Sequence, residues 1–159
     1  MRVKKAINLE AAREIGILFS MQSEADFDRI TRFVNELHAV GKKVQVVGLY
    51  HYRKLPPYYA QKLSYDLLLP GDLDFFYRPQ AKFAKSFIEH EFDMLIDLSP
   101  ANDFPLKYMA AMSKASFKLG SSSGEDDLPY DLMIETSGQI ESDELIRQLI
   151  HYTSVFKFK

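Results

Sequence analysis

The sequence predicts an α/β fold with three layers, in which a mainly parallel sheet of about six strands lies between helices. Segments 15–20 and 92–99 carry near-continuous apolar residues, which is typical of strands buried on both faces. Segments with helical periodicity alternate with the expected strands, and this alternation favours right-handed crossovers between parallel neighbours. We expect a single domain over residues 1–159, because no linker rich in glycine, proline or serine divides the chain.

The expected strands are short apolar or β-branched segments bounded by turn residues. The second follows a Gly-Lys-Lys turn, and the third stops at Pro70. In chain order the six segments are 15–20, 43–50, 65–69, 92–99, 117–120 and 130–135, of which the last two carry the weaker signal.

Helical patterns fill the gaps between these strands. The clearest begins after Ser23, an N-cap candidate, and stops at Gly41. Its apolar residues recur at offsets of three and four, and they are Phe27, Ile30, Val34 and Leu37. Pro79 and Pro105 each suit the first helical position of a further helix, and Ser142 is expected to cap the last one.

The connections predict the order of the strands. If the second and third strands are added in turn on one side of the first, the long segment 71–91 returns the chain to the other side of the first strand. The resulting order is 3-2-1-4-5-6, which is a Rossmann-like arrangement. Segment 121–129 is only nine residues long, whereas a parallel crossover usually needs about a dozen or more. We therefore expect the last strand to be antiparallel.

Composition narrows the class of protein. The chain has no cysteine and its four histidines are scattered, so we predict no metal and no cofactor. A net charge of −2 creates no field that favours nucleic acid. The N-terminal residues lack the continuous apolar stretch and the small-residue cleavage site of a signal peptide, so we expect no export by that route. The longest apolar stretches are too short to cross a bilayer. We expect a cytoplasmic protein that contacts neither nucleic acid nor membrane.

The predicted strand order also predicts a place for a ligand. In open α/β sheets, ligands bind beyond the carboxyl ends of strands, where the strand order reverses. Here that reversal falls between strands 15–20 and 92–99. The polar residues expected to line the crevice are Ser20, Gln22 and Ser23 from one loop, and Asp97, Ser99, Asn102 and Asp103 from the other.

Each part of this crevice has a functional and a structural interpretation. The segment from Ser20 to Ser23 is either an anion site at a helix N-terminus or ordinary capping, and the lack of glycines favours capping. Asp97 is either a general base or magnesium ligand, or the anchor of a neighbouring loop. Asp103 is either a second catalytic candidate or the cap of the helix at Pro105. We favour the structural roles.

Two loops carry further candidates. The segment from Tyr50 to Lys62 is predicted to be a long loop or short helix, and its His51 and Arg53 lie among tyrosines. It could stack a base or hold a phosphate, contact a protein, or simply cover the sheet edge, which we favour. Residues 120–127 have the small side chains of a phosphate cradle, but three adjacent carboxylates predict a surface loop instead.

Four segments resemble a family of short uncharacterised proteins found in Bacteroidota, over most of the chain. They are Ile15-Gly-Ile-Leu-Phe19, Phe92-Asp-Met-Leu-Ile-Asp-Leu-Ser99, Tyr108-Met-Ala-Ala-Met-Ser-Lys-Ala115 and Phe117-Lys-Leu-Gly120. From the fourth strand to Gly120 the chain is also faintly similar to the N-terminal Rossmann-like half of heptosyltransferase-type glycosyltransferases. Those enzymes place their nucleotide-sugar site mainly in a second domain, so this resemblance implies the fold rather than an activity.

The leading prediction is a non-catalytic, Rossmann-like domain that binds an unknown small molecule or a protein partner. No dinucleotide fingerprint or P-loop occurs in the sequence. The alternative is a reduced glycosyltransferase-like or nucleotide-handling enzyme that uses Asp97 or Asp103 at the reversal of the sheet. The chain could be a monomer, or a homodimer if Phe156 and Phe158 in the C-terminal tail form an edge strand.

Overall fold

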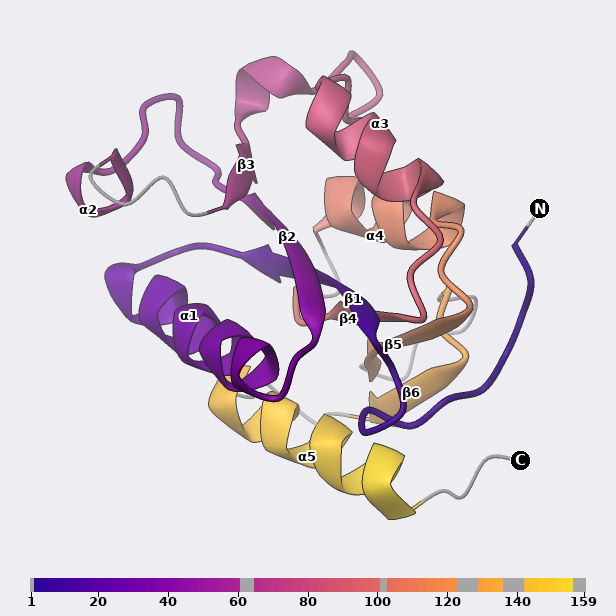
Figure 1. The fold of residues 1–159 in the computed structure, drawn as a ribbon. Helices are drawn as coiled ribbons and strands as arrows, with labels where there is room; N and C mark the ends of the chain where they lie inside the picture. Colours follow the sequence, from indigo (N-terminus) through magenta and orange to yellow (C-terminus); the bar gives the residue numbers. More distant parts are fainter. Residues whose placement is uncertain (1, 61–64, 101–102, 123–128, 136–141, 156–159) are drawn as a thin grey trace.

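The computed structural model describes residues 2–60, 65–100, 103–122, 129–135 and 142–155, and Figure 1 shows their arrangement. The strands are β1 (Glu14–Ser20), β2 (Lys43–Leu49), β3 (Asp66–Leu68), β4 (Met94–Asp97), β5 (Phe117–Ser122) and β6 (Leu132–Glu135). The helices are α1 (Glu24–Ala39), α2 (Pro57–Ala60), the 3-10 helix η1 (Pro70–Asp72), α3 (Lys82–Glu89), α4 (Phe104–Met112) and α5 (Ser142–Val155). Each of the six predicted strands is confirmed.

The six strands form one sheet in the order β3-β2-β1-β4-β5-β6, as the connections predict. β1 is central, and Ile17 pairs in parallel with Val46 of β2 and with Ile96 of β4. The chain therefore reverses its direction of travel across the sheet between β1 and β4, and the expected position of that reversal is confirmed.

The prediction of an antiparallel last strand is wrong, because β6 pairs in parallel with β5. The register explains how a short connection suffices. Leu132, the first residue of β6, lies beside Leu119, which is three residues before the end of β5 at Ser122. The chain has to return only about 10 Å along the strand direction, whereas the nine intervening residues can span up to about 30 Å.

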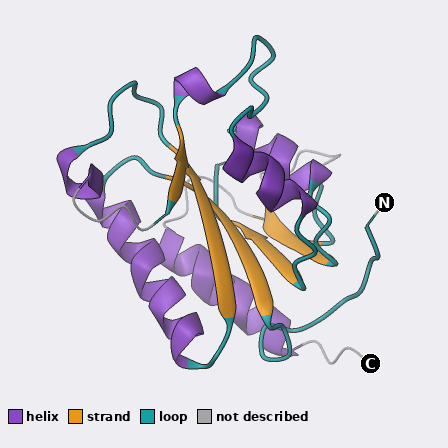
Figure 2. Cartoon of the chain, turned by 45° about the horizontal axis from the view of Figure 1, so that its top comes forward, coloured by secondary structure: helices purple, strands orange, loops and turns teal. Residues whose placement is uncertain are grey.

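Helices cover both faces of the sheet, which confirms the three-layer architecture (Figure 2). α1 and α5 pack on one face, where side chains such as Phe27 and Leu145 join a single apolar cluster with Ile17. α3 and α4 pack on the other face, where Phe87 and Met109 belong to a second cluster. The alternation of side chains along each strand divides its apolar residues between these two clusters.

The helix boundaries follow local signals in most cases. Ser23 caps α1 through a capping box with Asp26, and Gly41 has a φ of 83°, a left-handed conformation that glycine adopts without strain. Pro105 lies in the first turn of α4. The expectation for Pro79 is wrong, since α3 starts three residues later and Pro79 instead forms an antiparallel bridge with Leu73. That bridge closes the loop before α3.

Several expectations fall partly or wholly outside the described ranges. The segment from Tyr50 to Lys62 includes the short helix α2, as predicted, but residues 61–64 are not described. Most of the loop at residues 120–127 and both tail residues, Phe156 and Phe158, also lie outside these ranges. Within the ranges described, no helix combines the length and the apolar composition needed to span a membrane.

Candidate functional site

The carboxyl ends of β1 and β4 direct polar side chains toward the face covered by α3 and α4. Leu18 and Leu95 belong to the apolar cluster on that face. Because side chains alternate along a strand, Ser20 and Asp97, two residues further along, point to the same side. α4 directly follows β4, so the N-terminus of α4 lies at this edge of the sheet too.

Asp97 is fully buried, and hydrogen bonds occupy both of its carboxylate oxygens. Oδ1 accepts bonds from the backbone N–H and the hydroxyl of Ser99, at 2.9 and 2.5 Å. Oδ2 accepts bonds from Nζ of Lys107 at 3.1 Å and from the hydroxyl of Tyr130 at 2.5 Å. These four residues, here named the Asp97 cluster, connect β4, α4 and the segment that precedes β6.

Lys107 and Tyr130 also contact each other within the Asp97 cluster. Nζ of Lys107 donates to the Tyr130 hydroxyl at 2.8 Å and to the carbonyl oxygen of Ser99 at 3.2 Å. Burial, followed by the negative charge of Asp97, raises the pKa of Tyr130, so its hydroxyl keeps the proton that it donates to Asp97. The buried charges of the cluster thus have complementary partners inside the protein.

Asp103 is also buried, but its carboxylate is only partly bonded. It occupies the N-cap position of α4, as predicted, yet its side chain accepts no bond from the helix amides. The expectation of side-chain capping is therefore wrong. Oδ1 instead lies 3.3 Å from Nε2 of His51, at the end of β2, and Oδ2 is buried without a hydrogen-bond partner.

A pocket of about 350 Å³ opens beside Asp103 at the carboxyl edge of the sheet. This size falls within the range of small-molecule sites. Three segments meet here: the end of β2, the segment from η1 to the following loop, and the start of α4. The lining residues are Leu49, Tyr50, His51, Pro70, Leu73, Tyr77, Asp103, Phe104 and Pro105.

The loop that carries Tyr77 is held in a specific conformation. Tyr77 has a φ of 62°, in the left-handed region that a residue with a side chain rarely adopts. The carboxylate of Asp74 stabilises the turn by accepting bonds from the backbone N–H groups of Phe76 and Arg78, at 2.9 and 2.8 Å. The hydrogen bonds of this turn position Tyr77 at the pocket before any ligand arrives.

The structure brings His51 and Asp103 together at this pocket, but it places other candidates elsewhere. Ser99 belongs to the Asp97 cluster, and Arg53 is exposed on the loop after β2. Asn102 lies outside the described residues. Ser20 lies at the end of β1, and its Oγ is buried with no hydrogen-bond partner.

Capping accounts for the polar groups at the start of α1. The hydroxyl of Ser23 accepts a bond from the N–H of Asp26 at 3.3 Å. The carboxylate of Asp26 in turn accepts bonds from the N–H groups of Gln22 and Ser23, at 3.0 and 3.1 Å. A carboxylate of the chain thus occupies the position where an anion would bind.

Sequence reasoning missed Lys107 and Tyr130, and it missed Leu73 and Tyr77 in the pocket. Lys107 lies on α4, two residues after the predicted first helical residue. Because it is close in the sequence to the buried Asp97, it was a usable signal for an ion pair. Tyr130 is 33 residues from Asp97, and nothing local indicates that contact. Among the residues described, no group of three or more His, Cys, Asp or Glu side chains could hold a metal ion.

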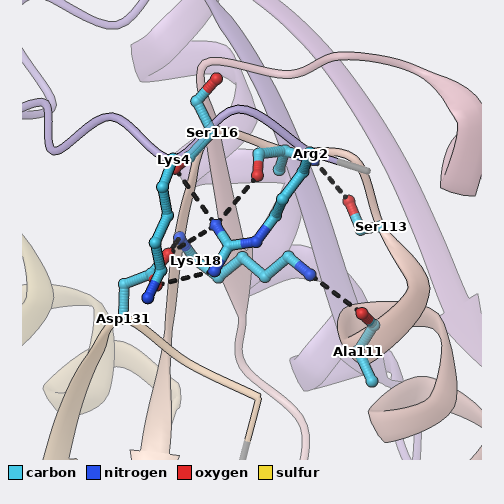
Figure 3. Close-up of polar contacts among 8 residues, drawn as sticks. Arg2, Lys4, Ala111, Ser113, Ser116, Lys118 and Asp131 are labelled. Carbon is cyan, nitrogen blue, oxygen red and sulfur yellow. Dashed lines mark hydrogen bonds and ion pairs between the residues drawn. The ribbon is translucent and has the colours of Figure 1, made fainter.

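A second polar cluster lies at the opposite, amino-terminal edge of the sheet (Figure 3). Arg2 donates to both carboxylate oxygens of Asp131, at 2.8 and 2.7 Å, and Lys4 lies 3.1 Å from the same carboxylate. Burial raises the pKa of Asp131, but hydrogen bonds from Arg2, from the backbone of Lys118 and from Lys4 outweigh it and lower the pKa to about 2. This carboxylate fixes the N-terminal segment to the sheet.

Lys118 is buried in the same cluster, and its Nζ donates to the carbonyl oxygen of Ala111 at 3.1 Å, near the end of α4 (Figure 3). Burial, followed by the positive charge of Arg2, lowers the pKa of Lys118 to about 8. The ammonium group thus satisfies a carbonyl at a helix C-terminus, where a positive charge is favourable.

Fold and pocket together define the class of this protein: a three-layer α/β domain with a Rossmann-like strand order and a small pocket at the carboxyl edge of its sheet. The chain belongs to the family of unknown function DUF6913, whose model matches residues 1–156. This confirms the predicted membership in a family without an assigned activity. No curated protein matches the chain.

A solved structure shares the fold. It is an exopolyphosphatase-related protein from Bacteroides fragilis, with a TM-score of 0.58 and 17% sequence identity over 91% of this chain. The match covers 41% of that protein, so this chain spans less than half of its length. At this identity the likeness supports the fold alone. Neither match supports a likeness to glycosyltransferases.

Proposed function

We propose that this domain is a non-catalytic binding domain that holds a small molecule in the pocket between β2, η1 and the start of α4. One observation carries the proposal: the pocket is largely apolar and of small-molecule size, and its wall includes His51 and Asp103, whose side chains lie 3.3 Å apart. We further propose a single cytoplasmic domain, either monomeric or homodimeric.

The state of Asp97 supports binding over catalysis at the reversal of the sheet. A general base needs a free lone pair, and a magnesium ligand must face the metal. Four donors already surround the carboxylate of Asp97, including the ammonium group of Lys107. Freeing it would break a buried ion pair, which is costly.

The contact between His51 and Asp103 favours a second candidate, a nucleotide-handling enzyme. A carboxylate that bonds one imidazole nitrogen can orient the ring, so that the other nitrogen acts as a general base. Nε2 of His51 lies 3.3 Å from Oδ1 of Asp103 at the wall of the pocket. In this alternative the loop after Tyr50 would engage the nucleotide.

Blocking the pocket tests the proposal. We expect Leu73→Trp to abolish the binding of aromatic fragments detected by ligand-observed NMR, because the larger side chain fills the space that they need. The control Val40→Trp places the same ring on an exposed surface, since Val40 is 69% exposed, and should leave binding intact. A fragment at a free concentration of 100 times its Kd should raise the free energy of unfolding of the wild type by about 2.7 kcal/mol.

Two outcomes would contradict the proposal. If no fragment binds the wild type, or if fragments bind Leu73→Trp and Val40→Trp equally well, the pocket is not a binding site. Turnover of a nucleotide panel by the wild type, lost in His51→Ala, would instead establish the second candidate.

A further inference from the structure

Aromatic side chains gather on the surface at the carboxyl edge of the sheet. They come from the loop after β2, from the loop between η1 and α3, and from the start of α4. Phe75 is 90% exposed, and the other four are 51–66% exposed. The five residues, here named the aromatic patch, are Tyr52, Phe75, Phe76, Tyr77 and Phe104. Exposed apolar rings are unfavourable in water, so a patch of this kind marks a surface for an interaction.

The pocket connects the parts of the aromatic patch. Tyr77 and Phe104 both line the pocket, and Tyr50 belongs to the same wall. The ring centroid of Tyr52 lies 5.3 Å from that of Tyr50. Residues from three separate segments therefore form one continuous aromatic surface around the pocket.

The turn between η1 and α3 holds Phe75 and Phe76 in a defined conformation. Backbone hydrogen bonds close the turn, from the N–H of Asp74 to the carbonyl oxygen of Arg78 and from the N–H of Tyr77 to that of Asp74, at 2.9 and 3.0 Å. The two phenylalanine rings lie edge to face, and the guanidinium group of Arg78 lies 5.2 Å from the ring centroid of Phe76. In Figures 1 and 2 the connection from β3 to α3 extends beyond the end of the sheet. A partner would meet rings that are already ordered, which lowers the entropic cost of association.

The size of the aromatic patch suits a protein partner. If a fully exposed aromatic side chain presents about 200 Å², the five residues together present about 650 Å². The largest apolar patch on a typical monomer covers only about 300–600 Å². A stable interface buries about 800 Å² on each partner, so the patch with its polar rim is large enough for a dimer.

The charges around the patch favour a second copy of this chain. In segments 50–55, 70–78 and 103–105, which carry the patch, carboxylates and cationic side chains are equal in number when His51 is counted as neutral. The six are Asp72, Asp74 and Asp103, and Arg53, Lys54 and Arg78. A surface without net charge does not attract nucleic acid or an anionic bilayer. It also does not repel its own copy, and a two-fold axis can place the cations of one copy near the carboxylates of the other.

We infer that a second copy of this chain docks on the aromatic patch, so that the two copies form a two-fold symmetric dimer. The patch combines aromatic residues with two arginines, which is typical of the centre of protein–protein interfaces. Because Tyr77 and Phe104 also line the pocket, the interface would surround its mouth. The dimer goes beyond the proposed binding function and does not depend on it.

Serine substitutions in the turn test the contribution of the rings. At a chain concentration of about 100 µM we expect the wild type to sediment as a dimer in analytical ultracentrifugation. Phe75→Ser combined with Phe76→Ser should raise the dissociation constant of the dimer by about 30-fold or more, because exposed aromatic residues at an interface are frequent hot spots. The matched control combines Val3→Ser with Val40→Ser, which removes two exposed apolar side chains near the opposite, amino-terminal edge of the sheet and should leave the constant unchanged.

Cross-linking tests the location of the interface without removing both rings. The chain has no cysteine, so Phe75→Cys and Val40→Cys each introduce a single thiol per copy. A short bismaleimide should join two copies of Phe75→Cys at dilute concentration and should leave Val40→Cys uncross-linked. This comparison decides the location even if the double serine variant fails to fold.

Three outcomes would overturn the inference. The first is a wild type that remains monomeric at high concentration. The second is a dimer that persists in the double serine variant but dissociates when Phe156→Ser and Phe158→Ser change the C-terminal tail, which lies outside the described residues. The third is a monomer that sediments with vesicles of phosphatidylcholine and phosphatidylglycerol only when Phe75 and Phe76 are intact, which would identify a lipid surface as the partner. Fragment binding to the pocket is measured separately, so the proposed function and this inference can fail independently.

Discussion

Asp97 and Asp103 are both buried aspartates at the carboxyl edge of the sheet, but their surroundings differ. The oxygens of Asp97 accept four hydrogen bonds within the protein, including one from the ammonium group of Lys107. Oδ2 of Asp103 accepts none. At the scale of single residues, this difference separates a carboxylate whose hydrogen bonds stabilise the fold from one that keeps a buried acceptor unsatisfied.

Removing the positive charge from the Asp97 cluster should destabilise the protein. Lys107→Met leaves a buried carboxylate without its ion partner, so we expect the free energy of unfolding to fall by about 3–5 kcal/mol, measured by urea denaturation. The control is Lys114→Met, because Lys114 pairs with Glu89 on the surface and its loss should have little effect. Equal urea midpoints for the two variants would contradict the assigned role of the cluster.

At the scale of elements, Gly120 allows β5 to pack closely against the segment that precedes β6. A Cβ atom at Gly120 would overlap the ring of Tyr130, the residue that donates to Asp97. The reason for glycine is therefore steric and does not involve an unusual backbone conformation. Because Gly120 has no side chain, Tyr130 can reach across β5 toward β4 and the buried carboxylate of Asp97.

Gly120→Ala should push Tyr130 away from Asp97. Overpacking costs about 1–3 kcal/mol, and a weakened hydrogen bond to Asp97 adds to that cost, so we expect a lower urea midpoint than in the wild type. Gly71→Ala is the matched control, because nothing lies within 4 Å of a Cβ at that position. If the two alanine variants unfold at the same urea concentration, the ring of Tyr130 is not fixed as described.

At the scale of the whole molecule, the N-terminal segment connects with the C-terminal half of the chain. Arg2 bonds to Asp131 and also donates to the carbonyl oxygens of Ala115 and Ser116, each at 3.2 Å. The backbone N–H of Lys5 donates to Ser116 at 3.0 Å. These contacts join segments more than one hundred residues apart, so their loss should affect unfolding of the whole domain.

Acid should weaken this connection. The pKa of Asp131 is lowered to about 2 in the folded protein, below its ordinary value of 3.8. Its contribution is therefore fully present above about pH 5 and is lost as the pH falls toward 2. For this partly exposed pair we expect a contribution of about 1–2 kcal/mol, seen as a steeper loss of stability in the wild type than in Asp131→Asn between pH 5 and 2. If the curves of unfolding free energy against pH are parallel for the wild type and Asp131→Asn, the contribution assigned to Asp131 is wrong.

Local patterns and chain connectivity determined most of the fold. The apolar segments, the cap at Ser23 and the stop at Gly41 act through neighbouring residues, so they predict strands and helices directly. The lengths of the connections likewise predicted the strand order and the reversal between β1 and β4. The connection lengths gave the wrong direction for β6, because its parallel pairing depends on a shifted register that no local signal encodes.

Tertiary structure alone decided how the polar residues are used. The sequence placed Asp97, Asp103 and His51 at the correct edge of the sheet, since that position follows from the strand ends. Which of these side chains are bonded depends on distant partners such as Tyr130 and on loop conformations such as that of Tyr77. Hydrogen bonds and pockets require groups to meet within a few ångströms, and packing sets those distances across the sheet.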